Sequence, residues 1–307
     1  MGDVYHTSVL QQEVLDSLNV ESGGLFCDVT LGDGGHAKAI LDRLPSKGVV
    51  VGIDQDSQAI QRAQHRLAAY GTQFRAIPGN FRNITELLGS AGIQQVDGFL
   101  CDLGVSMLQI SEPSRGFMFS QSGPLDMRMS ATGQTAEEIV NTLSEEELAD
   151  IIYQYGEERK SRRIARAIGR HRKERAIRTT QDLRDIVRQV VGERFLIKSL
   201  ARVFQSLRIY INDELGSLQE FLPQALSLLR SGGRLAIIDY HSLEARVIKD
   251  FIYEQTHPCT CPKDLPMCVC GKQPTLKIVH RQIKPSENEI LRNPSARSAR
   301  LRVMEKL

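Results

Sequence analysis

The chain has 307 residues, of which 41% are hydrophobic and 25% charged, a balance typical of a globular protein. Its length allows a large core plus a second module, so two domains are expected. No apolar run approaches the roughly 18 residues of a membrane-spanning helix, and no signal or transit peptide is recognisable, so we expect a cytoplasmic protein without membrane contact. Because the net charge is only +2, any binding of nucleic acid must depend on local basic patches.

The first informative segment joins a predicted strand near residues 25–29 to a predicted helix that starts near Ala37. Between them the chain reads Asp-Val-Thr-Leu-Gly-Asp-Gly-Gly-His from Asp28 onward. Glycines at a strand-to-helix turn let the backbone approach a ligand, and the first turn of the helix offers free N–H groups. The next predicted strand, 48–53, ends at Asp54, about 20 residues further on, where an acid can accept the hydroxyls of an adenosine ribose. This segment predicts a site for a nucleoside cofactor.

The glycine spacing alone leaves two classes of cofactor open. Gly32-x-Gly34-x-x-Ala37 satisfies the loose fingerprint of NAD or FAD binding. Two acidic residues favour S-adenosylmethionine instead, because Asp28 can meet the cationic ammonium group of the methionine moiety. A pyrophosphate would be repelled by both Asp28 and Asp33.

Predicted strands and helices alternate four times in the first third of the chain. The third and fourth strands are expected at 74–77 and 97–102. This alternation predicts an α/β fold with a doubly wound, mostly parallel, Rossmann-like sheet. Ligands bind at the carboxyl ends of such strands. The residues that fall there are Asp28, Asp54, Phe81 and Asp102.

The alternation stops near Gln109, and no convincing strand occurs before about Gln205. Ser144 precedes a helical pattern and is expected to cap it, with Glu147 three residues later, and another helix is expected to begin at 179–183. We therefore predict an all-helical domain at 109–205, inserted into a sheet domain formed by 1–108 and 206–307. A helix over 215–229 is expected to end at Gly232-Gly233. The later elements are expected to be a strand at 234–239, a helix at 242–254 and an antiparallel pair of strands at 276–279 and 300–304.

The six cysteines are of two kinds. Cys27 and Cys101 lie in predicted strands and are expected to be small core residues. The others form two Cys-x-Cys pairs separated by six residues: Cys259, Cys261, Cys268 and Cys270. Four thiols in so short a segment can bind zinc, although zinc sites more often place two or more residues within each pair. A structural zinc site and a metal-free loop both stay open.

The predicted helical insertion carries a basic patch. Between Glu157 and Arg178 there are ten Lys or Arg residues against three acids. The arginines that fall at helical spacing are Arg159, Arg162, Arg163, Arg166 and Arg170. Because the excess is of one sign, binding of phosphate is favoured over a merely solvated face. A second basic segment spans 292–300.

Along nearly its whole length the chain resembles the family of bacterial ribosomal RNA small subunit methyltransferase H. The segments that carry the resemblance are 6–10, 28–36, 79–81, 102–106, 115–117, 123–129, 204–209, 212–215, 241–244 and 293–300. The resemblance implies transfer of a methyl group from S-adenosylmethionine to the exocyclic N4 of a cytidine in the decoding region of 16S rRNA. It also implies the small ribosomal subunit as partner and an inserted helical domain, with a homodimer left open.

The resemblance also assigns roles to individual residues. The implied cofactor contacts are Gly34, Gly35, His36, Asp54, Phe81, Asp102 and Gln109. Asp54 would hold the ribose and Phe81 would pack on adenine. Asp102 is in addition the candidate acceptor for the amino hydrogens of cytosine. His241 and Glu244 are further candidates at a strand exit, although a capping role fits them equally.

One departure and two alternatives accompany this assignment. Asp239-Tyr240 stands where the family commonly has Ser-Phe, a change expected to be tolerated. A non-catalytic RNA-binding assembly factor with a residual cofactor pocket is the first alternative, and the intact Asp28 and Asp54 argue against it. An NAD-linked oxidoreductase is the second, and the acidic glycine loop argues against it.

Overall fold

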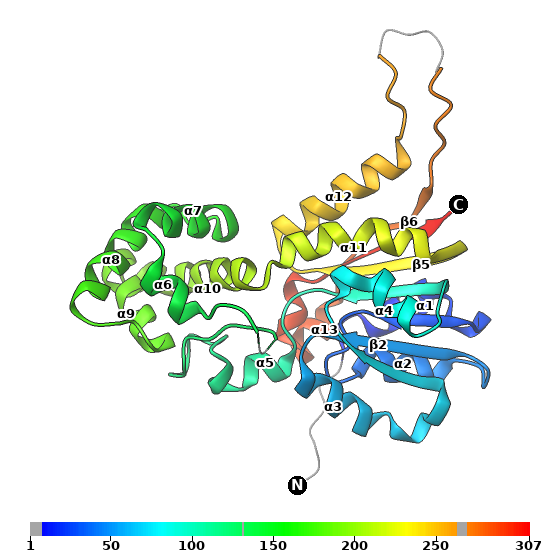
Figure 1. The fold of residues 1–307 in the computed structure, drawn as a ribbon, viewed down its shortest axis with the longest axis horizontal. Coiled ribbons are helices and arrows are strands. Elements are labelled where there is room, and N and C mark those ends of the chain that lie inside the picture. The colour runs from blue at the N-terminus through cyan, green and yellow to red at the C-terminus, as the bar shows by residue number, and fades with distance from the viewer. Residues whose placement is uncertain (1–7, 131, 263–268) are drawn as a thin grey trace. The chain divides into compact units, whose positions relative to one another are not determined.

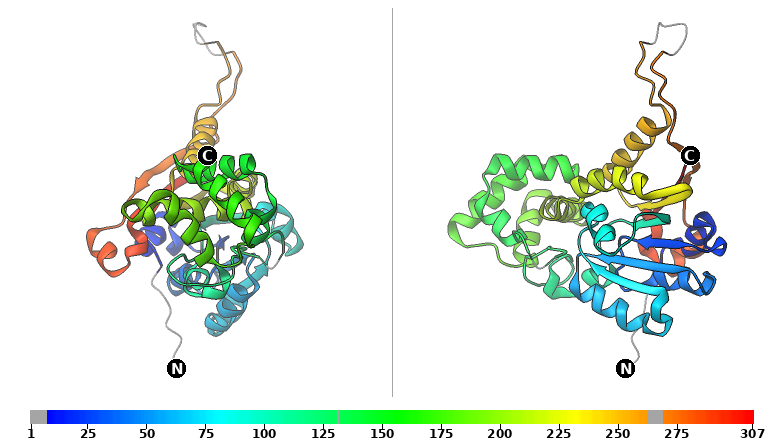
Figure 2. Two further views of the ribbon diagram at one scale, coloured as in Figure 1. Left: turned by 90° about the vertical axis from the view of Figure 1, so that its left-hand side faces the viewer. Right: turned by 45° about the vertical axis from the view of Figure 1, so that its right-hand side comes forward.

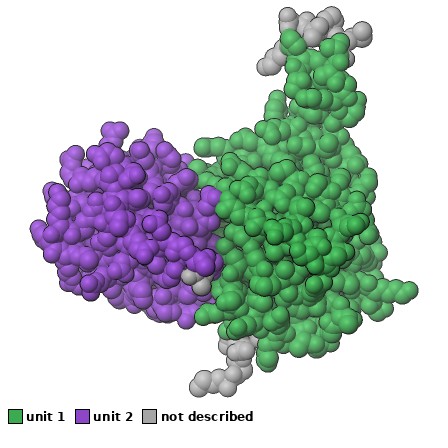
Figure 3. All heavy atoms as spheres, viewed as in Figure 1, with its two compact units in different colours: residues 1–104, 215–307 green, residues 105–214 purple. Residues whose placement is uncertain are grey.

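The computed structural model describes residues 8–130, 132–262 and 269–307, so His6, Thr7 and Cys268 lie outside the described residues. The chain divides into two compact units, one formed by residues 1–104 and 215–307 and the other by 105–214 (Figure 3). The second unit extends beyond the expected 109–205 segment by four residues at its start and nine at its end. Its end differs because one helix, α10 (Leu196–Asn212), continues through residue 205.

The first unit is built on a seven-stranded sheet in the order β3-β2-β1-β4-β5-β7-β6 (Figure 1). Its strands are β1 (Leu25–Asp28), β2 (Val49–Asp54), β3 (Phe74–Pro78), β4 (Val96–Asp102), β5 (Leu229–Asp239), β6 (Leu276–Ile283) and β7 (Arg300–Lys306). The first five strands are parallel, and β7 runs antiparallel to both of its neighbours. The strand order reverses at β1, which pairs with β2 on one side and β4 on the other. The predicted doubly wound, mostly parallel sheet is confirmed.

Helices cover both faces of this sheet. One face packs against α1 (Gln11–Leu18), α2 (Gly35–Arg43) and α3 (Ser57–Arg66), and the other against α4 (Ile84–Ser90), α11 (Glu214–Leu228) and α12 (Ser242–Thr256). Successive strand residues therefore enter different cores: Phe26 packs with the first set of helices and Cys27 with the second. Burial on both faces explains why these strands are continuous apolar runs. The shorter helices of this unit are Val20–Ser22, Ala68–Gln73, Phe81–Asn83, α13 (Glu287–Arg292) and Pro294–Ser298.

One predicted boundary is wrong. Gly232 and Gly233 do not end a helix, because α11 stops at Leu228 and both glycines lie within β5. The register of β5 against β4 shifts at this point, from Leu229 opposite Val96 to Arg234 opposite Gly98. Gly232 has a φ of +80°, a conformation that glycine adopts without strain. These glycines therefore form an irregularity in the strand.

The second unit is helical. Its helices are α5 (Met107–Ser111), α6 (Ala136–Thr142), α7 (Glu145–Gly156), α8 (Ser161–Glu174), α9 (Thr180–Val191) and α10, with 3-10 turns at Pro113–Arg115 and Glu193–Phe195. The expected cap at Ser144 is confirmed, because Ser144 forms a capping box with Glu147. Thr179 forms a second capping box, with Asp182, at the start of α9. In the part of the chain that the structure describes, no helix is long and apolar enough to cross a membrane.

Polar side chains fasten the long segment between α5 and α6. The Arg115 guanidinium donates to the carbonyl oxygens of Arg128 and Met129, both at 3.1 Å. The Asn212 side chain accepts from the backbone N of Met129 at 2.7 Å and donates to the carbonyl oxygen of Met127 at 2.9 Å. Met127 has a φ of +63°, so these bonds hold a backbone turn that a bulky residue rarely adopts. Much of the sequence that carries the family resemblance here is therefore structural.

A buried ion pair joins β5 to β7. Arg302 Nε donates to Asp239 Oδ2 at 2.6 Å, with side-chain exposures of 7% and 3%. The same guanidinium donates to the carbonyl oxygen of Arg281 at 3.0 Å. Buried charges are stable only when they are paired in this way, so each partner depends on the other.

We expect Arg302→Met to lower the free energy of unfolding by about 3–5 kcal/mol, because the Asp239 carboxylate stays buried without its cation. Asp239→Asn combined with Arg302→Met removes both charges and should recover much of the loss. Urea denaturation measures both effects. Arg281→Met is the control and should change stability by less than about 0.5 kcal/mol, since its side chain is exposed. An equal loss in the single and double variants would contradict the assignment.

Candidate functional site

Three carboxylates lie at the carboxyl ends of adjacent parallel strands. Asp28 is the last residue of β1, Asp54 of β2 and Asp102 of β4. Because β1 lies between β2 and β4, these residues gather where the strand order reverses. Doubly wound sheets bind their ligands at this place.

The glycine-rich loop connects β1 to α2 and is fastened to Asp54. The Asp54 carboxylate accepts the backbone N–H of Gly32 at 2.8 Å and that of Asp56 at 2.9 Å. Gly34 caps α2 with a φ of +75°, which favours glycine. A Cβ atom on Gly35 would lie 2.4 Å from Ser8 Oγ, so protein packing also requires a glycine there. The sequence argument gave only the ligand as a reason for glycine at this position.

Asp28 carries the least satisfied carboxylate of the three. Its side chain is 1% exposed, and Oδ1 accepts the Thr30 N–H at 3.2 Å. Oδ2 is buried and has no hydrogen-bond partner among the residues that the structure describes. Burial raises the pKa of Asp28 to about 7, and the Asp102 and Asp54 carboxylates add to the rise, while His36 opposes it. A buried acceptor without a donor indicates a place for a cationic ligand group.

His36 lies in the first turn of α2 and is 7% exposed. Its Nε2 is 3.5 Å from Asp102 Oδ2. Neither ring nitrogen has a hydrogen-bond partner within the described part of the chain. Together with Asp28 Oδ2, these nitrogens make a cluster of buried polar atoms at the strand ends that a polar ligand can satisfy.

Tyr240 contacts Asp102, a contact that sequence reasoning missed. The Tyr240 hydroxyl donates to Asp102 Oδ1 at 2.8 Å, and the backbone N–H of Asp102 donates to Thr30 Oγ1 at 2.7 Å. Burial and the adjacent Asp102 carboxylate raise the pKa of Tyr240, so its hydroxyl keeps its proton and acts as a donor. Tyr240 follows the last residue of β5, and β5 pairs with β4. No strand order was predicted from the sequence, and the pairing of β5 with β4 is what brings these two residues together.

Two other predicted site residues have structural contacts. Phe81 follows β3 and packs edge-to-face on Phe221, with 5.4 Å between ring centroids. Gln109 lies in the second unit, where its Oε1 accepts the Ser106 N–H at 3.0 Å and its own N–H donates to Ser106 Oγ at 3.2 Å. These bonds cap α5, and the cofactor role of Gln109 stays a prediction.

His241 and Glu244 form a capping box at the start of α12. Glu244 Oε2 accepts the backbone N–H groups of Tyr240 at 2.8 Å and His241 at 3.2 Å. The capping role that sequence left open for this pair is present.

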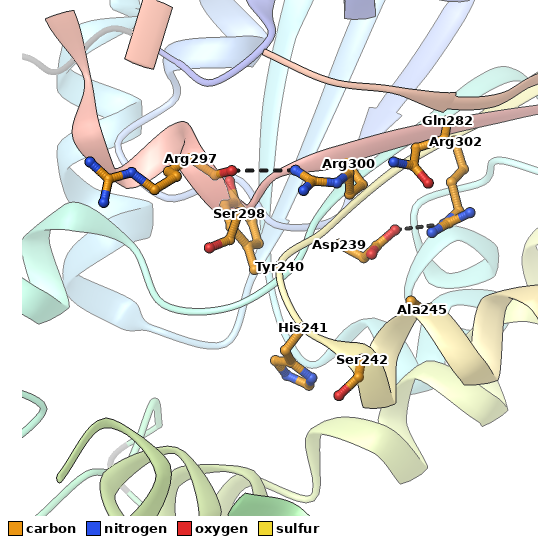
Figure 4. A pocket seen from close by; sticks show the side chains of 10 residues that line it. All are labelled: Asp239, Tyr240, His241, Ser242, Ala245, Gln282, Arg297, Ser298, Arg300 and Arg302. Atoms are coloured by element: carbon orange, nitrogen blue, oxygen red, sulfur yellow. Dashed lines mark hydrogen bonds and ion pairs between the residues drawn. The ribbon is translucent and has the colours of Figure 1, made fainter. Parts of the chain in front are cut away.

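A pocket of about 510 Å³ lies beside the end of β5 (Figure 4). Arg297 and Arg300 line it together with Arg302, whose charge is balanced by Asp239. Arg300 donates to the carbonyl oxygen of Arg297 at 3.3 Å, and neither of these two arginines has an acidic partner among the described side chains. The pocket is therefore positively charged and can accept an anion.

The basic stripe of the second unit is largely confirmed as one helix face. Arg162, Arg163, Arg166 and Arg170 are exposed on α8, whereas Arg159 precedes the helix. The opposite side of α8 buries Ile164, Ala165 and Ile168 in the helical core. None of the four arginines on the helix has an acidic side chain at ion-pair distance within the described residues.

The cysteines separate as expected. Cys27 and Cys101 are fully buried core residues. Cys259, Cys261 and Cys270 lie together on the segment between α12 and β6, with their sulfurs all within 4.8 Å of one another. Cys268 lies outside the described residues.

Residues 3–307 match the model of the MraW methylase family. The chain is 47% identical over 306 residues to ribosomal RNA small subunit methyltransferase H of Carboxydothermus hydrogenoformans, covering 98% of each chain. It is similar to the proteins of the same name from Geobacter sulfurreducens, at 46% identity over 98% of this chain and 99% of the relative, and Fusobacterium nucleatum, at 41% over 100% and 98%. The chain belongs to the MraW methylase family.

Proposed function

We propose that this protein transfers a methyl group from S-adenosylmethionine to N4 of a cytidine in the decoding region of 16S rRNA, within the small ribosomal subunit. Family membership supports methyl transfer, and the relatives' names support ribosomal RNA as the substrate. One observation supports S-adenosylmethionine as the cofactor. The strand-end carboxylates surround Asp28 Oδ2, an oxygen that has no hydrogen-bond donor among the described residues.

The residues at this cluster fit S-adenosylmethionine. The methionine ammonium group would give Asp28 Oδ2 the donor and the positive charge that it lacks. Asp54 uses its two oxygens for backbone N–H groups, yet a carboxylate has about four acceptor positions and can also take the ribose hydroxyls. The half-exposed ring of Phe81 would pack against adenine. A pyrophosphate would meet three carboxylates, which argues against a dinucleotide.

The cofactor supplies a methyl group that is already activated on a sulfonium, so the protein's contribution is alignment and proton handling. Methyl transfer to N4 of cytosine would leave one N4 proton to be removed, and Asp102 is the carboxylate that would accept it. Asp102 can accept a hydrogen bond from this amino group and localise its lone pair on nitrogen. The hydrogen bond from the Tyr240 hydroxyl fixes the orientation of the carboxylate.

Two basic features support an RNA substrate. The exposed arginines of α8 can contact backbone phosphates without reading bases. The pocket formed by Arg297 and Arg300 suits one further phosphate. A cytidine must leave its stack before its amino group can meet a methyl donor, and phosphate contacts would hold the strand in register while it does.

The function is tested by methyl transfer to small subunits isolated from cells that lack this protein. We expect one N4-methylated cytidine, located by mass spectrometry of nuclease fragments. Asp102→Asn should lower kcat by at least about 100-fold, the usual range for a lost acid–base group. Tyr240→Phe is the matched variant and should cost less than about 10-fold, because the carboxylate stays in place. Subunit binding without any methyl transfer would favour the assembly-factor alternative.

The affinity for cofactor should depend on pH through Asp28. Its pKa of about 7 in the free protein should fall when a cation binds, so binding releases a proton below pH 7. Affinity therefore rises with pH up to about 7 and is flat above that value until the ammonium group of the ligand loses its own proton. The measurement is calorimetric titration with S-adenosylhomocysteine, which has the same ammonium group. Repeating the titration in two buffers of different ionisation enthalpy gives the number of protons released on binding.

Asp28→Asn should weaken binding and remove the proton release. Asp33→Asn is the control, because Asp33 belongs to the same loop but pairs with Arg62 at 3.0 Å, and it should leave the pH dependence intact. Affinity that does not vary with pH in the unaltered protein would place the ammonium group elsewhere.

Reversing Arg162, Arg163 and Arg166 to Glu should raise the KM for small subunits and reduce its dependence on salt. A plot of the logarithm of the binding constant against the logarithm of the salt concentration has a slope set by the number of phosphate contacts. Each lost contact is expected to reduce the magnitude of this slope by about one. Affinity for cofactor should not change. The measurement is the rate of methyl transfer at several salt concentrations.

A matched control carries the same change of charge on the first unit: Lys47→Glu, Arg75→Glu and Lys249→Glu, all at exposed positions. If both triple variants raise KM equally, net charge rather than the α8 face governs binding. An unchanged KM in the α8 variant would remove this face from substrate recognition.

A further inference from the structure

Three cysteines outside the proposed active site lie on a segment that contains neither helix nor strand. This segment consists of residues 257–262, which follow α12, and 269–275, which precede β6; we call these two stretches the cysteine arms. In Figures 1 and 2 the arms run side by side away from the sheet. At the base of the arms, the Thr275 N–H donates a hydrogen bond to the carbonyl oxygen of Gln255 at 3.0 Å. The Thr275 hydroxyl also donates to Gln255 Oε1 at 2.7 Å.

The spacing of the sulfurs matches a metal site. Cys259 Sγ and Cys270 Sγ are 3.9 Å apart, and all three sulfurs lie within 4.8 Å of one another. Thiolates that bind one tetrahedral zinc at about 2.3 Å are separated by about 3.8 Å. A disulfide would require about 2.05 Å, roughly half the observed separation.

The surroundings of the sulfurs also suit a metal. The backbone N–H of Val269 donates to Cys261 Sγ at 3.4 Å, the kind of contact that orients a metal ligand. Cys259 is exposed, and Cys261 and Cys270 are half-buried, in contrast to the fully buried Cys27 and Cys101. Cysteine that serves packing is usually buried, so this cluster requires another reason for its thiols.

We propose that Cys259, Cys261 and Cys270 bind a structural zinc ion that cross-links the two cysteine arms. Thiolate ligands select zinc over the hard cations magnesium and calcium. The arms have no regular secondary structure, so a metal cross-link would supply the order that a hydrogen-bonded ladder gives elsewhere. The zinc ion would stabilise the fold of the cysteine arms and would take no part in methyl transfer.

The test uses the full-length protein, purified under reducing conditions without chelator. Elemental analysis should find about one zinc per chain. Exchange with cobalt(II) should produce thiolate-to-metal charge-transfer bands in the near ultraviolet. Cys259→Ser with Cys270→Ser should lower the bound zinc by at least 10-fold and abolish these bands. Thr260→Ser lies between two of the ligands, changes no thiol and should retain the metal.

Proteolysis gives a second readout that does not depend on activity. Removing zinc with a chelator should speed cleavage within the cysteine arms several-fold, and adding zinc back should restore resistance. If the cysteine variant folds poorly, the cobalt titration of the unaltered protein still decides. A reduced chain that takes up neither zinc nor cobalt overturns the proposal, as does a variant that retains its zinc. A disulfide between Cys259 and Cys270 in freshly isolated protein would overturn it as well.

Discussion

Crowding of negative charge at the carboxyl edge of the sheet is the constraint on which this site depends. The strand order places Asp28, Asp54 and Asp102 on neighbouring strands, where their charges repel. Asp54 accepts two backbone N–H groups, and Asp102 accepts the Tyr240 hydroxyl. Asp28 has only the N–H of the residue two positions on, so the unrelieved charge remains there. Protonation neutralises this carboxyl below its pKa of about 7, and a cationic ligand group is the other way to stabilise its charge, an arrangement that suits an ammonium group better than a pyrophosphate.

The same constraint shapes the loop after β1. Asp54 holds the loop through the Gly32 N–H, and the loop backbone then turns through the left-handed conformation of Gly34 into α2. This path brings His36 to the carboxylates within the first turn of the helix. Two independent constraints therefore require glycine in this loop. Gly34 adopts the left-handed conformation of the turn, and Gly35 packs against Ser8 without room for a side chain. A substitution in this loop would disturb the charge arrangement before any cofactor is present.

The part of this architecture that local patterns encode could be predicted from sequence. Apolar runs and capping residues predicted the parallel strands and the inserted helices, because those signals lie within a few residues of one another. Gly232 was misassigned, since a glycine after a helical pattern also fits an irregular strand, and only the register against β4 distinguishes the two. The bonds from Tyr240 to Asp102 and from Arg302 to Asp239 span 138 and 63 residues. No local pattern contains such contacts, and they follow only from the complete strand order.

The position of the insertion in the chain has a physical consequence for specificity. The second unit begins at Val105, three residues after Asp102, so its covalent attachment is at the carboxyl end of β4. An insertion there leaves the hydrogen bonding of the sheet intact, because connections at this edge lie outside the ladder. The pocket cannot distinguish one cytosine from the many others in an RNA, since every cytosine offers the same edge. Discrimination must come from contacts with the surrounding strand and from the ease of unstacking the base. Because the arginine-bearing helical unit is attached to the chain three residues after Asp102, the proposed phosphate contacts and the proposed acceptor group belong to one continuous segment.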